Sequence, residues 1–594
     1  MILSITLFFV IALGMGYTVL SLCKIDPEDS LLEYLFQILV VGFAIFSFLA
    51  VPLNILHIPL HISVYIILAL IYPVYKIQDI SVMLNSRKKI FKRINWFAVI
   101  ILLLFVIHTS VYIFGATRYP YLEDDDPWAH ASASKYVATY LTYSLKDNAR
   151  FSSYLEPYPP TYDVIMGIMH QSNQSINLTL KVFNAIMVSL SLIFFYLFAK
   201  ILINNRWYAM FSTIVLAVIP GFMSHFIWSH TLAVTLMIAA LYATIQAALD
   251  KKWMIPAIIV IGSMMVSHQF VSVLFGLFYI FILLVYFINK KYTFTKRVFK
   301  VGFFGVALGM VFWIEQFIKY GMQVITMRSG EFQAGQGWMS AYALQKYTLK
   351  MLVFPNPFPR IDQATGIGLI VFVLAIIGLF VTIYNWRSLS NQFIILLTVF
   401  TTYYLFSAHW IPIPGVSRAW VFISIPIALL SGKALCVVQA RFTKTLGIII
   451  VICLIATMIY NPGFKYKYDA QTGPWAPGAM WKSVEELQGY MSLTQLPPNS
   501  RVLPLCKNND LAVGMDMDND YWDIKEREFL LSLPNQSVQG VNAYMRSRNY
   551  EYVIGDVSCL EFIGYNESNY ILGGLAQTNE VVLSNQNFYL WRVI

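Results

Sequence analysis

Long apolar runs recur along the first 460 residues and are separated by short polar segments. Most runs are as long as the roughly 20 residues that a helix needs to cross a bilayer. A transmembrane barrel would show short strands of alternating polarity instead. The pattern predicts a polytopic α-helical membrane protein with about fourteen spans. The predicted spans cover residues 2–22, 31–53, 57–75, 96–114, 178–199, 207–221, 231–248, 254–268, 270–288, 301–320, 365–385, 391–410, 418–435 and 444–460.

The pattern changes after the multi-span region 1–461. The segment 462–594 is polar and has Pro and Gly near its start. Its periodicity predicts a helix over 481–491 and strands over 501–505, 550–555, 581–583 and 588–594. This mixture of elements over a segment of domain length predicts a separate α/β domain.

Composition supports the membrane assignment and excludes other classes. Hydrophobic residues make up 58% of the 594 residues and charged residues 12%, against about 25% charged residues in soluble domains. This balance excludes an ordinary soluble enzyme and a disordered chain. Five Cys are too few for a disulfide framework, and no basic helix or zinc spacing suggests a nucleic-acid partner.

The charges are distributed unevenly and predict the topology. The first 460 residues hold 31 basic and 16 acidic residues, whereas 10 basic and 15 acidic residues follow. Basic residues in short loops favour the cytoplasm, so the alternate loops and the C-terminal domain are expected to be extracytoplasmic. The basic loop residues include Lys76, Arg87, Lys88, Lys89, Lys92, Arg93, Lys200, Arg206, Lys251, Lys252, Lys290, Lys291, Lys296, Arg297, Lys300, Arg387, Arg441 and Lys444.

Two of the predicted external loops are long, 115–177 and 321–364, and loops of this length are usually functional. The first contains an apolar segment, 162–170, that we expect to lie on the membrane as a helix. The external face also carries four Asn-x-Ser/Thr sequons, which are candidate N-glycosylation sites. They are at Asn173, Asn177, Asn535 and Asn566.

A dense acidic segment follows the span that ends near Phe114. It reads Glu-Asp-Asp-Asp-Pro-Trp-Ala-His over residues 123–130. Adjacent carboxylates repel one another unless a cation binds, and hard divalent cations prefer oxygen ligands. A carboxylate here can alternatively act as a general base. A third interpretation is a solvated turn in which Asp126 caps a helix that starts at Pro127.

The segment 126–130, Asp-Pro-Trp-Ala-His, resembles the Asp-Pro-Trp-x-His segment of oligosaccharyltransferase catalytic subunits, which are GT-C membrane glycosyltransferases. The proline-rich segment 156–162 is similar to the one that follows in the same loop of that family. The segment 415–420 resembles the family's arginine at the outer end of a late helix. A multi-span region followed by an external α/β domain also agrees with the family's architecture.

This resemblance implies roles for particular residues. Asp126 matches the loop aspartate that binds a metal or activates the acceptor, and Asp124 is expected to join it as a ligand of Mg²⁺ or Mn²⁺. Arg418 matches the arginine that faces the donor phosphate, and a planar, permanently charged guanidinium suits that anion. The alternative for Arg418 is an interfacial side chain that snorkels to lipid head groups.

The sequence also departs from the family. The signature Trp-Trp-Asp-Tyr-Gly does not open the C-terminal domain, where residues 502–506 read Val-Leu-Pro-Leu-Cys, and the fragment Tyr-Trp-Asp comes later, at 521–523. In the stretch 220–230, where the family carries acidic residues, this chain has His225 and His230. These His are candidate metal ligands or phosphate-facing donors.

Five further residues are candidates by position: Asp125, His130, Glu315, Arg328 and Glu331. Glu315 lies inside an apolar span, where a carboxylate is a functional candidate by default, although Lys319 one turn away also suits a structural ion pair. Arg328 and Glu331 lie in a loop that can close over a substrate.

Cys506 and Cys559 are the Cys residues of the domain that we place outside. Each follows a predicted strand, and an extracytoplasmic compartment is oxidising. We therefore predict a disulfide between them.

The leading hypothesis is an extracytoplasmic glycosyltransferase that uses a polyprenyl- or dolichyl-linked sugar and a protein, lipid or glycan acceptor. Membrane lipid surrounds it, and a prokaryotic plasma membrane is favoured over the endoplasmic reticulum. An oligosaccharyltransferase acting on protein Asn is the near alternative. A transporter or channel is the rival class, but transporters usually show paired halves and broken midplane helices, which the sequence does not show.

Overall fold

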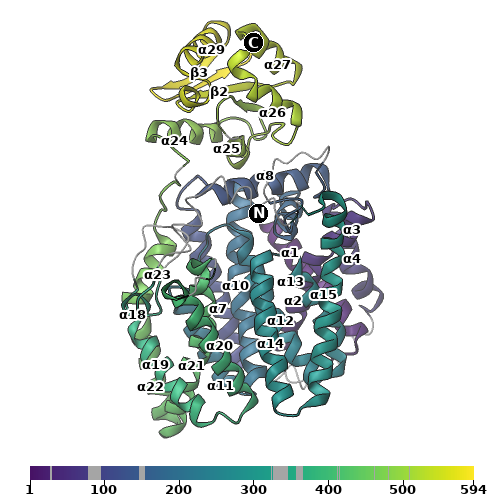
Figure 1. Ribbon diagram of the computed structural model, residues 1–594, viewed down its shortest axis with the longest axis vertical. Coiled ribbons are helices and arrows are strands. Elements are labelled where there is room, and N and C mark those ends of the chain that lie inside the picture. The colour runs from purple at the N-terminus through teal and green to yellow at the C-terminus, as the bar shows by residue number, and fades with distance from the viewer. Residues whose placement is uncertain are drawn as a thin grey trace.

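The computed structural model describes residues 1–26, 30–77, 95–145, 154–322, 324, 346–355, 365–410, 413, 415–460, 462–478, 480–507 and 509–594. A bundle of long helices forms one part of the molecule, and a small domain stands on one end of it (Figure 1). The helices up to residue 472 are α1 (Ile2–Leu22), α2 (Leu31–Phe48), α3 (Ala50–Ile55), α4 (Ile62–Tyr75), α7 (Trp96–Ala116), α8 (Asp125–Tyr140), α9 (Thr161–His170), α10 (Ile176–Ile203), α11 (Arg206–Val218), α12 (Ser229–Leu249), α13 (Met254–Met265), α14 (Gln269–Ile288), α15 (Tyr292–Tyr320), α18 (Leu349–Val353), α19 (Leu369–Tyr384), α20 (Leu389–Phe406), α21 (Ala419–Arg441), α22 (Lys444–Tyr460) and α23 (Pro462–Thr472).

The polytopic helical fold class is confirmed, but the predicted count of about fourteen spans is not. Each predicted span coincides with a helix. Among the described residues, nine helices are long and apolar enough to cross a membrane, or up to ten if the bent pair Thr445–Tyr460 and Phe464–Thr472 is one span. Apolar helices such as α4, α11 and α19 have 14, 13 and 16 residues, which is shorter than a bilayer requires.

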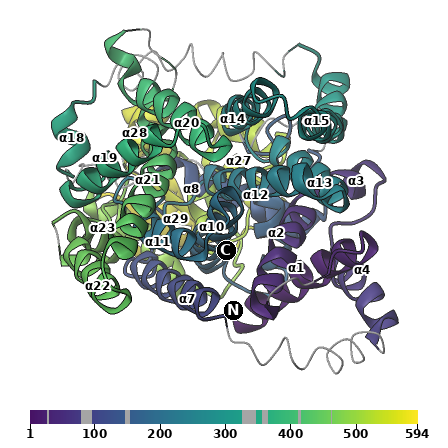
Figure 2. The same cartoon turned by 90° about the horizontal axis from the view of Figure 1, so that it is seen from below.

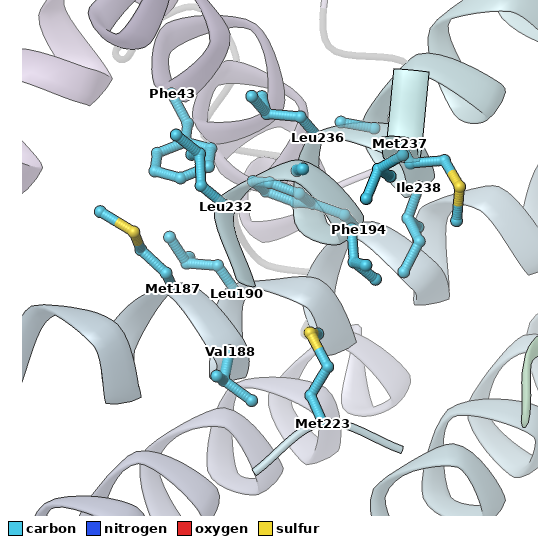
Figure 3. Close-up of a cluster of buried hydrophobic side chains, with 14 of the residues drawn as sticks. Phe43, Met187, Val188, Leu190, Phe194, Met223, Leu232, Leu236, Met237 and Ile238 are labelled. Carbon is cyan, nitrogen blue, oxygen red and sulfur yellow. The ribbon is translucent and has the colours of Figure 1, made fainter. Parts of the chain in front are cut away.

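The core of the bundle forms around α10, which packs against α7, α11 and α12 and lies near the centre in Figure 2. Nearly all of its residues are buried, because neighbouring helices pack around it. Figure 3 shows part of this core, where Phe43 of α2 meets Phe194 of α10 at a ring separation of 6.0 Å. Leu232 and Leu236 of α12 close the cluster.

Basic loop residues gather at one end of the bundle, which we call the basic end. Lys200 and Arg206 both pair with the buried Glu33, at 2.9 Å and 3.3 Å. Lys252 Nζ donates to the Lys24 carbonyl at 2.8 Å, so several loops meet here. The positive-inside rule assigns this end to the cytoplasm, and that orientation stays a prediction.

The opposite end, which we call the domain end, is closed by α8 and α9. We expected the segment 162–170 to lie on the membrane as a helix. It is a helix, but Thr161–Met169 are all buried, because α9 packs against α8 and α10. The surface placement was therefore wrong, and α9 is part of the platform under α8.

The C-terminal domain has the predicted α/β content. Its sheet contains β1 (Val502–Pro504), β2 (Tyr552–Asp556), β3 (Glu580–Asn585) and β4 (Phe588–Arg592), in the order β1-β2-β4-β3. Strands β1 and β2 are parallel, and the other pairs are antiparallel. Its helices are α24 (Val484–Met491), α25 (Asp510–Gly514), α26 (Ile524–Leu531), α27 (Val538–Ser547), α28 (Cys559–Phe562) and α29 (Tyr565–Thr578).

The parallel pairing of β1 and β2 brings their carboxyl ends side by side. Cys506 and Cys559, which follow these two strands, form a disulfide in the structure with Cα atoms 4.8 Å apart.

The C-terminal domain is held on α8 by buried contacts. Ser132 Oγ donates to Asp510, and Lys135 Nζ donates to the Met517 carbonyl at 2.8 Å. A Cβ on Gly514 would lie 2.3 Å from the Trp128 ring, so only Gly permits this approach. The helix α8 therefore lies between the bundle and the domain (Figure 1), and its residues contact both.

Candidate active site

The acidic segment forms the start of α8. Asp124 occupies the N-cap position, so Asp126 is the second residue of the helix and Pro127 the third. The alternative in which Asp126 caps a helix that starts at Pro127 is therefore wrong. The half-buried Asp126 carboxylate accepts a hydrogen bond from the Tyr154 hydroxyl. Carboxylates in a first turn are favoured by the helix dipole, so the position of Asp126 in α8 does not depend on a capping role.

His130 lies one turn further along α8 and is fully buried. Its Nδ1 is 2.8 Å from Asp163 Oδ1, and its Nε2 accepts from the Ser229 N–H at 3.3 Å. This geometry places the proton on Nδ1, where Asp163 orients the ring. Burial raises the pKa of Asp163, and His130 opposes that rise. The ring centroids of His130 and Tyr154 are 4.0 Å apart. Tyr154 therefore contacts both Asp126 and His130.

A second group of side chains surrounds Arg418, which stands at the N-cap position of α21. Its guanidinium carbon is 5.4 Å from the Trp228 ring centroid, and its Nη1 is 3.5 Å from His268 Nε2. His230 lies behind Trp228, with ring centroids 4.6 Å apart. We call Trp228, His230, His268 and Arg418 the arginine cluster.

The two groups meet at the start of α12. Ser229 donates its N–H to His130 and bonds the Tyr158 hydroxyl through Oγ at 2.8 Å. The Tyr158 ring is in turn 6.0 Å from the ring of His268. The starts of α12, α14 and α21 therefore come together beside His130 of α8, and each of these three starts brings the positive end of a helix dipole. Such a site can bind an anion beside a carboxylate base.

The four predicted metal ligands, Asp124, Asp126, His225 and His230, do not form one site. His225 Nδ1 is 2.8 Å from Gln471 Oε1, and its Nε2 is 3.0 Å from the Tyr119 hydroxyl. Among the residues that the structure describes, no group of three or more His, Cys, Asp or Glu is placed to hold a metal ion. The predicted ligand set does not fit a metal, and a requirement for Mg²⁺ or Mn²⁺ stays a prediction.

His225 instead belongs to a buried polar contact between the bundle and the segment after α23. Its ring stacks on Trp475 at 3.9 Å, and burial lowers the pKa of His225 to about 3. The Tyr119 hydroxyl is hydrogen-bonded to both His225 and Glu123. Burial raises the pKa of Glu123, and the charge of Lys181 partly opposes that rise. This contact fixes the chain just before the Asp residues of α8, which is a positioning role.

Glu315 takes part in an ion pair at the domain end. Its carboxylate is 2.8 Å from Lys319 Nζ, which also lies 2.5 Å from Glu156 in the proline-rich segment. The structure thus agrees with the ion-pair alternative for Glu315. Arg328 and Glu331 lie outside the described residues.

The sequons differ in their surroundings. Asn177 donates its amide to the Pro120 and Gly514 carbonyls, and the Asn173 amide bonds Thr179. Asn535 and Asn566 are exposed on the C-terminal domain. Glycosylation at any of them stays a prediction, and the exposed pair offers the more accessible amides.

Sequence reasoning missed the partners that shape the site: Tyr154, Asp163, Trp228 and His268. Tyr154 and Asp163 lie 28 and 33 residues beyond the side chains that they hold. The available signal was positional, since Trp228 and His268 lie two or three residues before the predicted spans 231–248 and 270–288. Polar and aromatic residues at several span starts on one side of a membrane would have indicated a shared site.

No family model and no curated protein matches the chain. Similar solved structures include the apo oligosaccharyltransferase of Archaeoglobus fulgidus, with a TM-score of 0.46, 12% identity, and coverage of 81% of this chain and 73% of that chain. They also include ArnT from Cupriavidus metallidurans bound to undecaprenyl phosphate, with a TM-score of 0.48, 12% identity, and coverage of 83% and 98%. Both are GT-C glycosyltransferases, the superfamily that the segment 126–130 resembles, and the likeness concerns the fold.

Proposed function

We propose that this protein is an integral membrane glycosyltransferase that moves a sugar from a polyprenyl-phosphate-type lipid to an extracytoplasmic acceptor. One observation carries the proposal: Asp126 on α8, through Tyr154 and His130, and Arg418 before α21, through Trp228, are both connected to the start of α12 at the domain end of an apolar bundle. A carboxylate that can act as a base and a guanidinium that can hold phosphate are the two groups that such a transfer needs.

The proposed reaction uses these groups on opposite sides of the sugar. Arg418 and the helix N-termini stabilise the charge that develops on the leaving phosphate. Asp126 accepts the proton of the acceptor hydroxyl or amide as that group attacks the anomeric carbon. The bond from that carbon to the phosphate oxygen breaks, and the polyprenyl phosphate leaves with the electron pair. Attack opposite to the leaving group inverts the anomeric centre.

The contacts of the Tyr-Trp-Asp fragment disfavour the oligosaccharyltransferase alternative. Trp522 Nε1 donates to the Tyr140 hydroxyl at 2.7 Å, which attaches the domain to α8. Asp523 caps α26 and pairs with Arg548 at 2.7 Å. Both side chains serve the domain's own structure, so recognition of an Asn-x-Ser/Thr acceptor has no support from this fragment.

The transporter alternative is disfavoured by where the buried ion pairs lie. In the described bundle, Glu33 pairs at the basic end, whereas Glu156 and Glu315 pair at the domain end. A transporter would place its ion and substrate groups near the membrane midplane. The arginine cluster also lies at helix starts, where a lipid head group can reach it.

Mass spectrometry of lipid-linked, protein-linked and lipid-anchored glycans tests the proposal in cells. Cells with the wild-type protein should carry a glycan that is missing from cells without it, and the corresponding polyprenyl-linked sugar should accumulate in its absence. Expression of Asp126→Asn should restore neither change. Identical glycan profiles with and without the protein would exclude the proposed activity.

A further inference from the structure

Two buried tyrosines reach the candidate active site from one short segment. Tyr154 donates its hydroxyl to Asp126, and its ring lies beside that of His130. Tyr158 bonds Ser229 Oγ at the start of α12. Residues 154–160 form turns between α8 and α9. The hydrogen bonds of a helix or a sheet therefore do not hold these two rings in place, and a side-chain contact has to.

Glu156 lies midway between the two tyrosines, and its carboxylate is buried. It accepts hydrogen bonds from two neighbouring elements. From the residues after α8 it accepts from Ser144 Oγ at 3.1 Å and from the Leu145 N–H at 3.3 Å. The donors from the last turn of α15 are Gln316 Nε2 at 3.4 Å, Lys319 Nζ at 2.5 Å and the Tyr320 hydroxyl at 3.2 Å. One carboxylate thus joins the tyrosine segment to the end of α15 and to the chain that leaves α8.

Lys319 supplies the charge that allows this carboxylate to be buried. The Glu156 side chain is 1% exposed and the Lys319 side chain 35%. A buried carboxylate is strongly disfavoured unless a cation and hydrogen bonds compensate for its lost hydration. Glu315 also pairs with Lys319, but its carboxylate accepts from Tyr143 on the other side. The position of Glu156 therefore depends on the last turn of α15.

We infer that Glu156 is a positioning residue for the glycosyl transfer: held by Lys319, it fixes Tyr154 so that the Tyr154 hydroxyl orients the Asp126 carboxylate. This inference rests on the proposed function and deepens it, because it adds a contact at α15 to the support of the base. Small displacements of a reacting group are costly. Glu156 acts through Tyr154 and takes no part in the chemical step itself.

The first test measures release of polyprenyl phosphate by the full chain in liposomes at varied donor concentration. Glu156→Gln keeps the shape of the side chain but removes its charge and sets an amide N–H among the donors of α15. We expect kcat to fall about tenfold or more. The KM for the lipid donor should stay within about twofold, because the arginine cluster is left in place. A folded Glu156→Gln protein with wild-type kcat would overturn the inference.

Variants of Lys319 test the same contact from its partly exposed side. Lys319→Met removes the cation and should lower kcat as Glu156→Gln does, whereas Lys319→Arg keeps the charge and should retain most of the rate. The double variant Glu156→Gln, Lys319→Met should lose no more than either single variant, because each change breaks the same pair. Losses that multiply in the double variant would show that the two side chains act separately and would contradict the inference.

A Tyr154→Phe background separates positioning from a merely structural role. This change keeps the ring beside His130 and removes the hydroxyl that bonds Asp126. In that background Glu156→Gln should lower kcat by less than about twofold further, because the contact that Glu156 orients is already gone. A structural role predicts the same loss in both backgrounds, and that result would exclude positioning through Tyr154.

Glu315→Gln is the matched control, since it removes the other carboxylate of Lys319 and leaves Glu156 paired. It should retain the wild-type kcat, and an equal loss would contradict a specific role of Glu156. The failures are distinguishable. If the wild type releases no polyprenyl phosphate, the proposed function fails and this inference with it. If Asp126→Asn abolishes release while Glu156→Gln keeps the wild-type kcat, the proposed function stands and this inference alone fails.

Discussion

Arg418 combines a permanent charge with a planar fork that rests on the Trp228 ring. A Lys would keep the charge but lose the fork and the stacking, which together suit phosphate. We expect Arg418→Lys to raise the KM for the lipid donor about tenfold or more and to leave the KM for the acceptor unchanged. Initial rates with donor and acceptor varied separately measure both values.

Arg387→Lys is the matched control for this change, because Arg387 is exposed between α19 and α20. It should behave as the wild type with both substrates. If Arg418→Lys affects donor and acceptor equally, or neither, Arg418 does not hold the donor phosphate.

Residue motifs predicted Asp126, His130 and Arg418, but not the side chains that orient them. Tyr154 and Asp163 reach α8 from the far part of the same loop, and that approach depends on how α9 packs. Local sequence patterns report periodicity and composition, whereas such pairings are set by tertiary packing. The described residues do not bring the predicted metal ligands together for the same reason, since His225 stacks on Trp475 instead.

At the scale of single elements, the start of α8 is fixed by the segment that enters the C-terminal domain. A Cβ on Gly478 would lie 2.7 Å from Asp124 Cα, so a larger residue must displace one backbone or the other. Small displacements of catalytic groups are costly. We expect Gly478→Ala to lower the transfer rate by roughly tenfold or more, as measured in a transfer assay, with the protein still folded.

Gly573→Ala provides the control for a Gly substitution. Gly573 lies on the exposed side of α29, and nothing is within 4 Å of its added Cβ. Ala in a helix interior is favoured over Gly by about 1 kcal/mol, so this variant should be as active as the wild type and no less stable. Full activity of Gly478→Ala would show that the segment does not position α8.

Helix α26 contains a carboxylate that should make stability depend on pH. Burial raises the pKa of Glu526 to about 7, partly opposed by the hydrogen bond from Tyr550. The folded chain therefore binds a proton that the unfolded chain releases near pH 4.5. Below pH 4.5 this carboxyl group costs the folded state nothing. As pH rises toward 7, the free energy of unfolding falls by about 3 kcal/mol in total. Unfolding of the domain across pH 4.5–7 measures the slope.

Glu526→Gln should remove this slope, because an amide does not titrate. Glu528→Gln, an exposed change in the same helix, should keep the wild-type slope. The hypothesis fails if the wild type and Glu526→Gln show the same pH dependence.

The helices and strands themselves were predicted where a long apolar run or an alternating strand decides them, although α15 begins at Tyr292, before the predicted span 301–320. Every predicted span corresponds to a helix, and the strands of the C-terminal domain were found. The predicted number of spans was not confirmed, because α11 and α13 have only 13 and 12 residues, fewer than a bilayer requires. The burial of α9 was also not predicted, because an apolar helix that faces lipid has the same sequence pattern as one that packs against protein.

For the molecule as a whole, the basic end and the domain end make the orientation testable. Lys290 is exposed in the loop before α15, and Asn566 is exposed on the C-terminal domain. In a chain with Cys23, Cys436 and Cys453 replaced by Ser, a membrane-impermeant maleimide should label Asn566→Cys but not Lys290→Cys in intact cells. Both should react after permeabilisation. The opposite pattern would invert the topology.

The central claim is that Asp126 serves as the base of a lipid-linked glycosyl transfer at the domain end. Purified protein in liposomes, given polyprenyl-linked sugars and a membrane extract as acceptor, should release polyprenyl phosphate that mass spectrometry can quantify. Asp126→Asn keeps an oxygen that can accept from Tyr154, so it should fold normally while release falls roughly 100-fold or more. Asp469→Asn, an exposed change on α23, should release lipid as the wild type does. A folded Asp126→Asn protein with wild-type release would contradict the account.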